Sequence, residues 1–332
     1  MDILDAFQDL NPPSRSEAPC TAFNGVQLPA HRGCHLGKDQ SRRPAILIGA
    51  PSSERGTRAP SIALENLRVE HGVSCVVTPP SGSTIRARFS VVHCLSAEPN
   101  LQAYFLRVMA TVLDSLPERY GTRELSAAID NLARLFHALQ QAPSRPARGL
   151  WAELLVIGEA SSPDLMIEAW HSEPTERTDF CLDRHRIEVK CSGDRGRRHH
   201  FSLEQLCPPS GVTTLVASVH VESVAAGSTI GVLWDQAREY VAGRPDLRMK
   251  VERVCMATLG SSWEEAREKA YDLRLARESL AFYDAAAIPK IPADLPQGVS
   301  EVHFLSDLSL AEPIDVRAWR SRRGLFGALP AV

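Results

Sequence analysis

Residues 178–192, TDFCLDRHRIEVKCS, decide how the rest of the chain is interpreted. This stretch predicts two short strands joined by a tight polar turn, because apolar and polar residues alternate on both sides of the turn. Side chains two residues apart in a strand point to the same face, so Glu188 and Lys190 share a face. The hairpin can bring Asp179 beside them. Two carboxylates and one ammonium group then converge at the surface of a sheet.

Such a group of side chains can bind a hard divalent cation, because carboxylate oxygens are the ligands that such ions prefer. It is also the minimum set for metal-assisted attack of water on a phosphodiester. Asp179 and Glu188 fit as ligands of Mg²⁺ or Mn²⁺, together with the backbone carbonyl of Val189. A structural interpretation stays open, in which Glu188 and Lys190 form an exposed cross-strand pair and Asp179 is an acid near the turn.

The spacing of Asp179 and Glu188-Val189-Lys190 resembles the PD-(D/E)XK nuclease superfamily, in which an Asp and an ExK motif lie on adjacent strands. Thr178 stands where that superfamily often has Pro. A preceding helix often supplies a Glu and a following helix a Gln, which here correspond to LWAELLVIGEA and FSLEQL. The wider chain resembles a bacterial family regarded as PD-(D/E)XK members and frequently found in phage-defence gene clusters.

The resemblance implies a metal-dependent endonuclease that hydrolyses the phosphodiester bonds of DNA. By this resemblance, Lys190 orients the attacking water, Glu153 is an outer ligand or a ligand of a second metal ion, and Gln205 positions the site. It also implies DNA and helicase- or ATPase-like defence proteins as partners, with a homodimer left open. Two alternatives remain: a catalytically inactive nuclease-fold module that binds nucleic acid or assembles a complex, and a metal-independent nucleic-acid-binding protein.

The charge distribution restricts how nucleic acid could be bound. The chain of 332 residues has a formal net charge of −3, which argues against a histone-like binder. Between residues 184 and 200, however, five arginines and one lysine face only two acids. The loop after the ExK motif is therefore the candidate for phosphate contact. The residues assigned to it are Arg195, Arg197, Arg198, His199 and His200.

Composition predicts an ordinary globular protein, with 44% hydrophobic and 23% charged residues. No run of eighteen apolar residues suggests a membrane span, and the start MDILDAFQDL lacks the basic region of a signal peptide. The eight cysteines contain no CxxC pair, so we expect reduced thiols and a cytoplasmic location.

The predicted fold class is α/β (α+β): a restriction-endonuclease-like mixed sheet flanked by helices, after a β-rich region and a pair of helices. The first domain, residues 1–145, is predicted to serve as a scaffold, clamp or partner-docking region. Its expected strands are 45–50, 62–71, 73–78 and 85–95, with a hairpin turn near Gly72; its helices are 99–116 and 122–141, the second capped by Thr122.

The second predicted domain, residues 146–332, follows a linker at 142–149 that is rich in proline and glycine. Its first helix, 149–160, is apolar almost all round and contains Glu153, a costly position for a carboxylate without a partner. Further helices are expected at 202–206, 228–243 and 262–286. The expected strands, besides the hairpin, are 164–171, 213–222, 301–307 and 313–319, with a loop at 193–200.

Overall fold

The predicted hairpin forms in the computed structural model, which describes residues 2–14, 21–49, 60–171 and 177–331. Strand β7 (Phe180–Leu182) pairs antiparallel with β8 (His185–Ser192), and Phe180 lies opposite Ile187. Asp183 occupies the turn with a φ of 51°, a left-handed conformation that Asp tolerates better than most residues.

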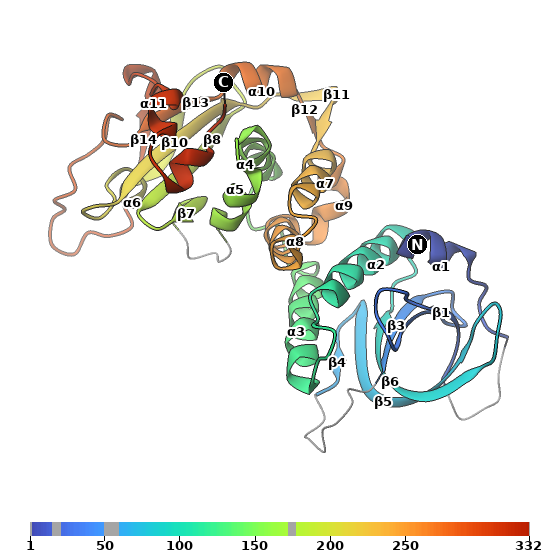
Figure 1. Cartoon of the computed structure of the whole chain (residues 1–332). Coiled ribbons are helices and arrows are strands. Elements are labelled where there is room, and N and C mark those ends of the chain that lie inside the picture. Colours follow the sequence, from blue (N-terminus) through green and yellow to red (C-terminus); the bar gives the residue numbers. More distant parts are fainter. Residues whose placement is uncertain (1, 15–20, 50–59, 172–176, 332) are drawn as a thin grey trace. The chain divides into compact units, whose positions relative to one another are not determined.

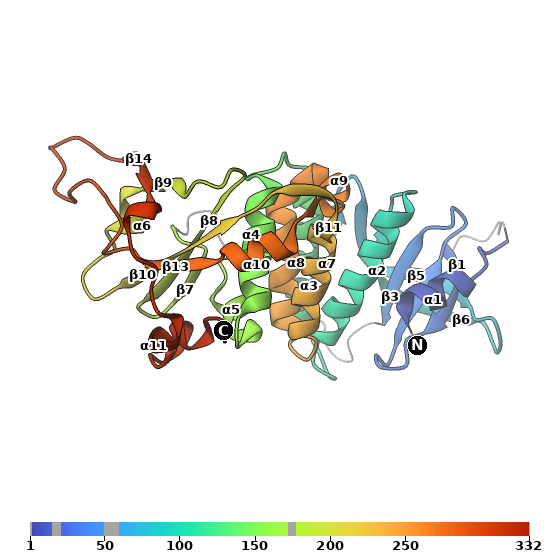
Figure 2. The ribbon, with the colours of Figure 1, turned by 90° about the horizontal axis from the view of Figure 1, so that it is seen from above.

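The hairpin is one side of a four-stranded sheet with the order β13-β10-β8-β7. Strand β10 (Thr213–His220) runs parallel to β8, whereas β13 (Ala281–Asp284) runs antiparallel to β10. The sheet is therefore mixed, and helices accompany it (Figures 1 and 2), so the structure is of the mixed α/β kind that the sequence predicts.

An apolar cluster and a group of helices pack against this sheet. Glu188, Val216 and Tyr283 are register partners across β8, β10 and β13, so they share one face. An apolar cluster packs on that face, made of Phe201, Leu206, Val216, Tyr283, Ala285, Ile288 and Leu308. Helix α4 (Ala147–Glu159) packs against β8 and against α7 (Ile230–Tyr240) and α8 (Pro245–Leu259). As predicted, α4 is buried along most of its length.

The chain divides into two compact units, residues 1–140 and 141–332. The remaining elements of the second unit are α5 (Pro163–Ala169), β9 (Arg198–Ser202), α6 (Leu203–Leu206), β11 (Ser223–Thr229), η1 (Gly260–Ser262), α9 (Trp263–Arg267), β12 (Ala270–Tyr271), α10 (Leu273–Ser279), β14 (His303–Asp307), η2 (Leu308–Leu310), α11 (Val316–Arg320) and η3 (Gly324–Ala328).

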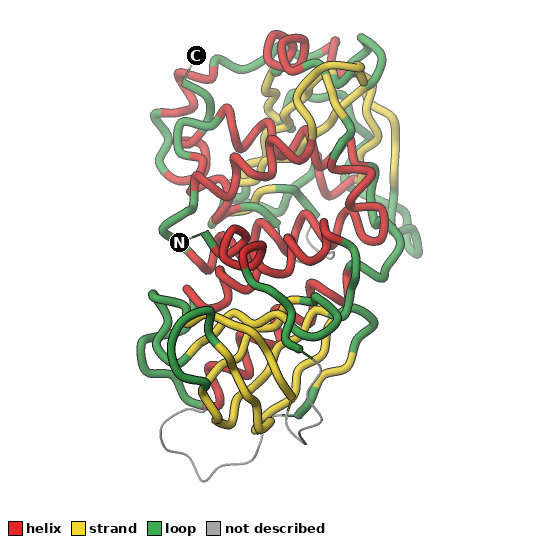
Figure 3. The backbone as a smooth tube through the Cα atoms, turned by 90° about the vertical axis from the view of Figure 1, so that its right-hand side faces the viewer, coloured by secondary structure: helices red, strands yellow, loops and turns green. Residues whose placement is uncertain are grey.

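The first unit is built around a ring of strands, visible in Figures 1 and 3. The order is β1-β2-β3-β6-β5, and a parallel pairing of β1 with the end of β5 closes the ring. Its apolar core includes Phe23, Leu47 and Phe89. The elements are α1 (Ile3–Asp9), β1 (Thr21–Gln27), β2 (Cys34–Lys38), β3 (Pro44–Gly49), β4 (Ile62–Ala63), β5 (Leu67–Thr78), β6 (Ile85–Cys94), α2 (Pro99–Asp114) and α3 (Thr122–Ala138).

Two local predictions in the first unit are wrong. The hairpin turn at Gly72 is instead a bulge inside the single strand β5, where the register to β6 shifts between Glu70 and Val73. Gly72 has a φ of 68°, which fits a bulge as well as a turn, so the glycine signal was ambiguous. Helix α3 is capped by Gly121 rather than Thr122, because the Glu124 carboxylate accepts the Gly121 N–H.

Residues 164–171, predicted as a strand, instead form helix α5 up to Ala169. Pro163 begins this helix, a position that proline favours because its missing N–H has no helical partner. Seven residues are too few for apolar spacing to separate a helix from a strand. Only the end of the segment is extended, where Trp170 forms an isolated bridge to Phe180.

The predicted helix 262–286 ends after one turn and a half, at Arg267. Ser262 makes no side-chain cap bond there, and Asp272 instead caps the separate helix α10 by accepting the Leu275 N–H. Residues 281–284 pair with β10, so tertiary pairing overrides the local helical pattern. Residues 313–319 are also not a strand, because Asp315 caps helix α11.

The basic segment 193–200, predicted as a loop, becomes strand β9 from Arg198 onward and pairs with β14. Arg197 precedes the strand, and its guanidinium is directed into the fold. It donates to the carbonyl and hydroxyl oxygens of Ser218 at 3.0 and 2.9 Å and to the Ser279 carbonyl at 2.5 Å. Arg197 therefore links the start of β9 to β10 and to the end of α10.

We expect Arg197→Ala to lower the free energy of unfolding by about 2–4 kcal/mol, because the Ser218 and Ser279 acceptors lose a charged donor. The neighbouring Arg198 is exposed, so Arg198→Ala should change stability by no more than about 0.5 kcal/mol. Urea unfolding followed by circular dichroism compares the two variants. Equal stabilities would contradict the structural role of Arg197.

Candidate active site

The five residues that the sequence analysis singled out for catalysis line one pocket of about 750 Å³. They come from four places in the second unit: helix α4, the residue before β7, strand β8 and helix α6. The set comprises Glu153, Asp179, Glu188, Lys190 and Gln205. Residues that are 52 positions apart in sequence, from 153 to 205, thus line the same pocket.

Asp179 directly precedes β7 and contacts both β8 and Arg145. Its Oδ2 accepts the Val189 N–H at 2.7 Å, and its Oδ1 lies 3.3 Å from Nη1 of Arg145. Burial raises the pKa of Asp179 well above its usual value, and the negative charges of Glu188 and Glu153 raise it further. A carboxylate in this position is unfavourable without a cation.

Glu188, Lys190 and Gln205 form a second group of contacts. Glu188 Oε1 lies 2.7 Å from the Lys190 ammonium and accepts the Gln205 amide N–H at 2.6 Å. Lys190 also donates to Gln205 Oε1 at 3.2 Å. The other oxygen, Glu188 Oε2, is buried and has no hydrogen-bond partner among the residues that the structure describes. Burial raises the pKa of Glu188, although the charge of Lys190 and its hydrogen bond oppose this shift.

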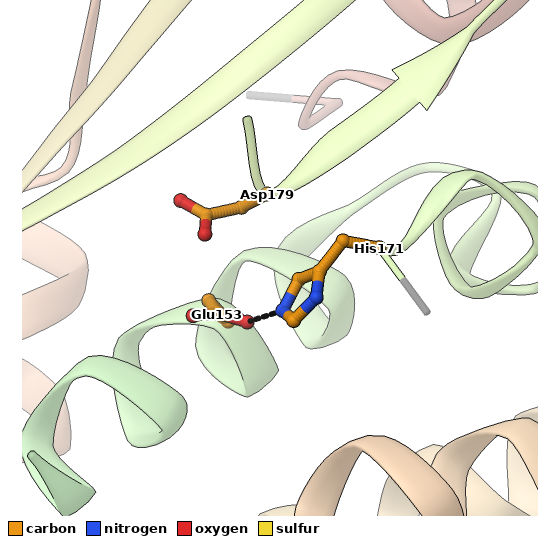
Figure 4. A group of neighbouring side chains, drawn as sticks. All are labelled: Glu153, His171 and Asp179. Carbon is orange, nitrogen blue, oxygen red and sulfur yellow. Dashed lines mark ion pairs between the residues drawn. The ribbon is translucent and has the colours of Figure 1, made fainter. Parts of the chain in front are cut away.

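Glu153 lies on helix α4 and faces His171 (Figure 4), and it is only 5% exposed. Its Oε2 accepts the Trp170 indole N–H at 2.7 Å and lies 3.3 Å from His171 Nε2. Its Oε1 lies 3.3 Å from Arg145 Nη1. Burial raises the pKa of Glu153, but the neighbouring hydrogen bonds and the charge of Arg145 outweigh it, so the pKa falls below its usual value.

Two residues of this site, Arg145 and His171, were missed by the sequence analysis. His171 ends the segment that was read as a strand, and its backbone N–H donates to the Asp179 carbonyl at 2.8 Å. Arg145 lies in the proline-rich segment that was read only as a linker. Their sequence signals, a histidine after a tryptophan and an arginine before a proline, are too common to indicate a site.

The side chains fit a divalent cation. Glu153, His171 and Asp179 each offer one ligand atom, and these three atoms lie within 4.8 Å of one another. The unpartnered Glu188 Oε2 adds a further buried acceptor in the same pocket. An imidazole nitrogen suits Mn²⁺ and other transition metals better than Mg²⁺, which prefers oxygen. The Val189 carbonyl as a ligand stays a prediction.

The basic loop contributes less to the pocket than expected. Of the five residues assigned to phosphate contact, only His200 lines it. Arg195 points to Glu222, at 3.6 Å. His199 is buried against Ser218, and burial lowers the pKa of His199 to about 4, so the ring is neutral at physiological pH. The arginines that do line the pocket are Arg145, Arg148 and Arg177.

The chain matches one protein-family model over residues 5–309, a family described as "Putative PD-(D/E)XK family member, (DUF4420)". Because the match covers nearly the whole chain, the protein belongs to this family. None of the curated proteins and none of the solved structures matches the chain. In the described part of the chain, each helix is too short or too polar to span a membrane.

The raised pKa of Asp179 predicts how stability depends on pH without metal. The folded state holds the Asp179 carboxyl proton more tightly than the unfolded chain does. In the unfolded chain the pKa of this carboxyl is near 3.8. Ionisation therefore destabilises the fold increasingly as the pH rises above that value. We expect metal-free Asp179→Asn to have a higher Tm than the wild type near neutral pH, with the difference shrinking as the pH falls.

Thermal unfolding in a chelator, from neutral to acidic pH, measures this difference. Asp183→Asn is the matched control, because Asp183 is an exposed carboxylate in the same hairpin. Excess Mn²⁺ should raise the Tm of the wild type more than that of Asp179→Asn. An Asp179→Asn variant that is less stable than the wild type at every pH in the chelator would contradict the assignment.

Proposed function

We propose that the protein is a metal-dependent endonuclease that hydrolyses phosphodiester bonds of DNA. The observation that carries this proposal is the burial of Glu153, Asp179 and Glu188 around one pocket that also holds the Lys190 ammonium. Three carboxylates in one buried place need cations. The description of the family to which the chain belongs also names the PD-(D/E)XK group.

The mixed sheet of the second unit supports the proposal. The hairpin β7-β8, the parallel neighbour β10 and the packed helix α4 are the elements that we assign to a restriction-endonuclease-like core. In that arrangement the helix supplies Glu153 and the hairpin supplies Asp179, Glu188 and Lys190. We therefore assign the second unit as the nuclease domain.

A bound divalent cation supplies a more acidic water and neutralises phosphate charge. Glu153, His171 and Asp179 would hold this ion, with Glu188 beside them, because their ligand atoms lie within 4.8 Å of one another and Glu188 lines the same pocket. Lys190 is fixed between Glu188 and Gln205, so its ammonium can orient water and offset the negative charge that develops on the phosphate. Gln205 acts through these two residues and is a positioning residue.

The partners follow from the proposal and from the family resemblance. Arg148 and Arg177 line the pocket and can contact the phosphates that flank the cleaved bond. We assign the first unit, residues 1–140, to docking or clamping within a bacterial phage-defence system in the cytoplasm that includes a helicase- or ATPase-like protein. A homodimer is an alternative way of presenting two such sites to a duplex.

We expect Asp179→Ala, Glu188→Ala and Lys190→Ala each to reduce cleavage at least about 100-fold, because each removes a metal ligand or the charge beside it. A panel of plasmid, linear, single-stranded and modified DNA, incubated with Mg²⁺ or Mn²⁺, measures this. Arg274→Ala is the control, because that side chain is 87% exposed on α10. Wild-type rates in the three site variants would refute the proposal, and DNA binding without cleavage by the wild type would favour an inactive module.

The nitrogen ligand gives a second, independent test of the metal centre. We expect Mn²⁺ bound to the wild type to show nitrogen modulation in electron spin echo spectra, because His171 Nε2 faces the carboxylate oxygens. His171→Gln should lose this modulation while retaining Mn²⁺ at reduced affinity. Unchanged modulation in this variant would show that another nitrogen binds the ion.

A further inference from the structure

We propose that Arg145 occupies the cation position in the metal-free site, and that a divalent cation binds by displacing this guanidinium toward the substrate phosphate. The inference rests on the proposed function and assigns a role to a residue that the PD-(D/E)XK motif does not contain. Arg145 is then both a temporary counter-ion for the buried acids and the residue that receives the phosphate once the metal is in place.

The guanidinium contacts the same three residues that a metal ion would need. Nη1 of Arg145 lies 3.3 Å from Glu153 Oε1 and 3.3 Å from Asp179 Oδ1. Nη2 lies 2.6 Å from His171 Nε2. Glu153, Asp179 and His171 are the three residues whose ligand atoms lie within 4.8 Å of one another. Arg145 therefore bridges the whole set of candidate ligands.

The third contact of the guanidinium is with His171. An arginine can only donate hydrogen bonds, so His171 Nε2 is the acceptor from Arg145 Nη2 at 2.6 Å. The same nitrogen lies 3.3 Å from Glu153 Oε2, beside the carboxylates that would share a metal ion with it. Arg145 therefore contacts the imidazole nitrogen that would serve as the nitrogen ligand.

Arg145 and a metal ion cannot use these atoms together. A bound ion lies about 2.0–2.2 Å from its ligands, which is inside the space that the guanidinium nitrogens share with the same three acceptors. Two cations this close also repel each other strongly in a buried site. Metal binding must therefore move the guanidinium away.

The movement is confined to the side chain. Ser144 ties the backbone on one side, since its N–H donates to the Thr258 carbonyl at 3.1 Å and its hydroxyl to the Ala257 carbonyl at 2.8 Å. Pro146 caps α4 on the other side. The Arg145 side chain itself is 42% exposed and lines the pocket, so it can turn toward a bound phosphate and contact two of its oxygens.

The test compares Arg145→Gln with Arg148→Gln, which removes a positive charge from the same pocket without touching the ligand atoms. The first measurement is Mn²⁺ affinity, from the electron paramagnetic resonance signal of the free ion. We expect Arg145→Gln to bind Mn²⁺ about 10-fold more tightly than the wild type, because the competing cation is gone. Arg148→Gln should change this affinity by about twofold or less.

The second measurement is the affinity for a DNA duplex in Ca²⁺, where we expect Arg145→Gln to bind more weakly than the wild type. Opposite effects on metal and DNA affinity support the proposal, whereas a merely structural role would weaken both. Arg145→Lys, which keeps the charge with a smaller donor group, should give intermediate values and covers the case in which Arg145→Gln does not fold.

The outcomes separate this inference from the proposed function. Mn²⁺ affinity that is equal in the wild type and in Arg145→Gln, but lost in Asp179→Asn, would overturn the role of Arg145 and leave the metal centre standing. No Mn²⁺ binding by the wild type or by Arg145→Gln would overturn both. Mn²⁺ binding by Arg145→Gln but not by the wild type would support the displacement most strongly, because Arg145 would then block the metal position completely.

Discussion

The burial of three carboxylates in one pocket is the constraint on which the second unit depends. Glu153, Asp179 and Glu188 are each less than 9% exposed, and isolated buried carboxylates are too unfavourable to persist. Two cationic side chains compensate these charges. Lys190 pairs with Glu188, and Arg145 lies between Glu153 and Asp179. The elements that carry these five groups must hold them together, so helix α4, the hairpin and the segment before α4 are fixed by one electrostatic requirement.

The two cations are not equivalent. Lys190 is held by Glu188, by Gln205 and over the Phe201 ring, and its side chain is 20% exposed. Arg145 has three acceptors as well, but they are the candidate metal ligands and its side chain is 42% exposed. Lys190 is therefore a permanent part of the site. Arg145 instead occupies the position where a divalent ion, with its higher charge density, would bind more strongly.

The sequence predicted the features whose signals lie within a short segment, and it missed those that depend on packing between distant segments. The hairpin, α4, α6 and β10 were predicted correctly because alternation, burial and the Ser202 cap are local properties. Asp179, Glu188 and Lys190 were singled out through a motif whose spacing reflects strand geometry, whereas Glu153 and Gln205 were assigned by the family resemblance. His171 and Arg145 could not be found, because their roles arise from packing between segments 26 residues apart. The hydrogen bonds of Arg197 to Ser218 and Ser279 were missed for the same reason, and the contact of Arg197 with phosphate stays a prediction.

The connection between the units explains why Arg145 belongs to the site. The Gln141 carbonyl accepts the Ser261 N–H at 2.8 Å, and Ser144 is bonded to the last turn of α8, so this segment is part of the second unit from residue 141 onward. A flexible linker could not keep a guanidinium within 3.3 Å of two buried carboxylates. The proline-rich stretch that looked like a spacer in the sequence is hydrogen-bonded to α8 and lines the pocket, so the proposed displacement of Arg145 needs only its side chain to move, rather than a whole loop.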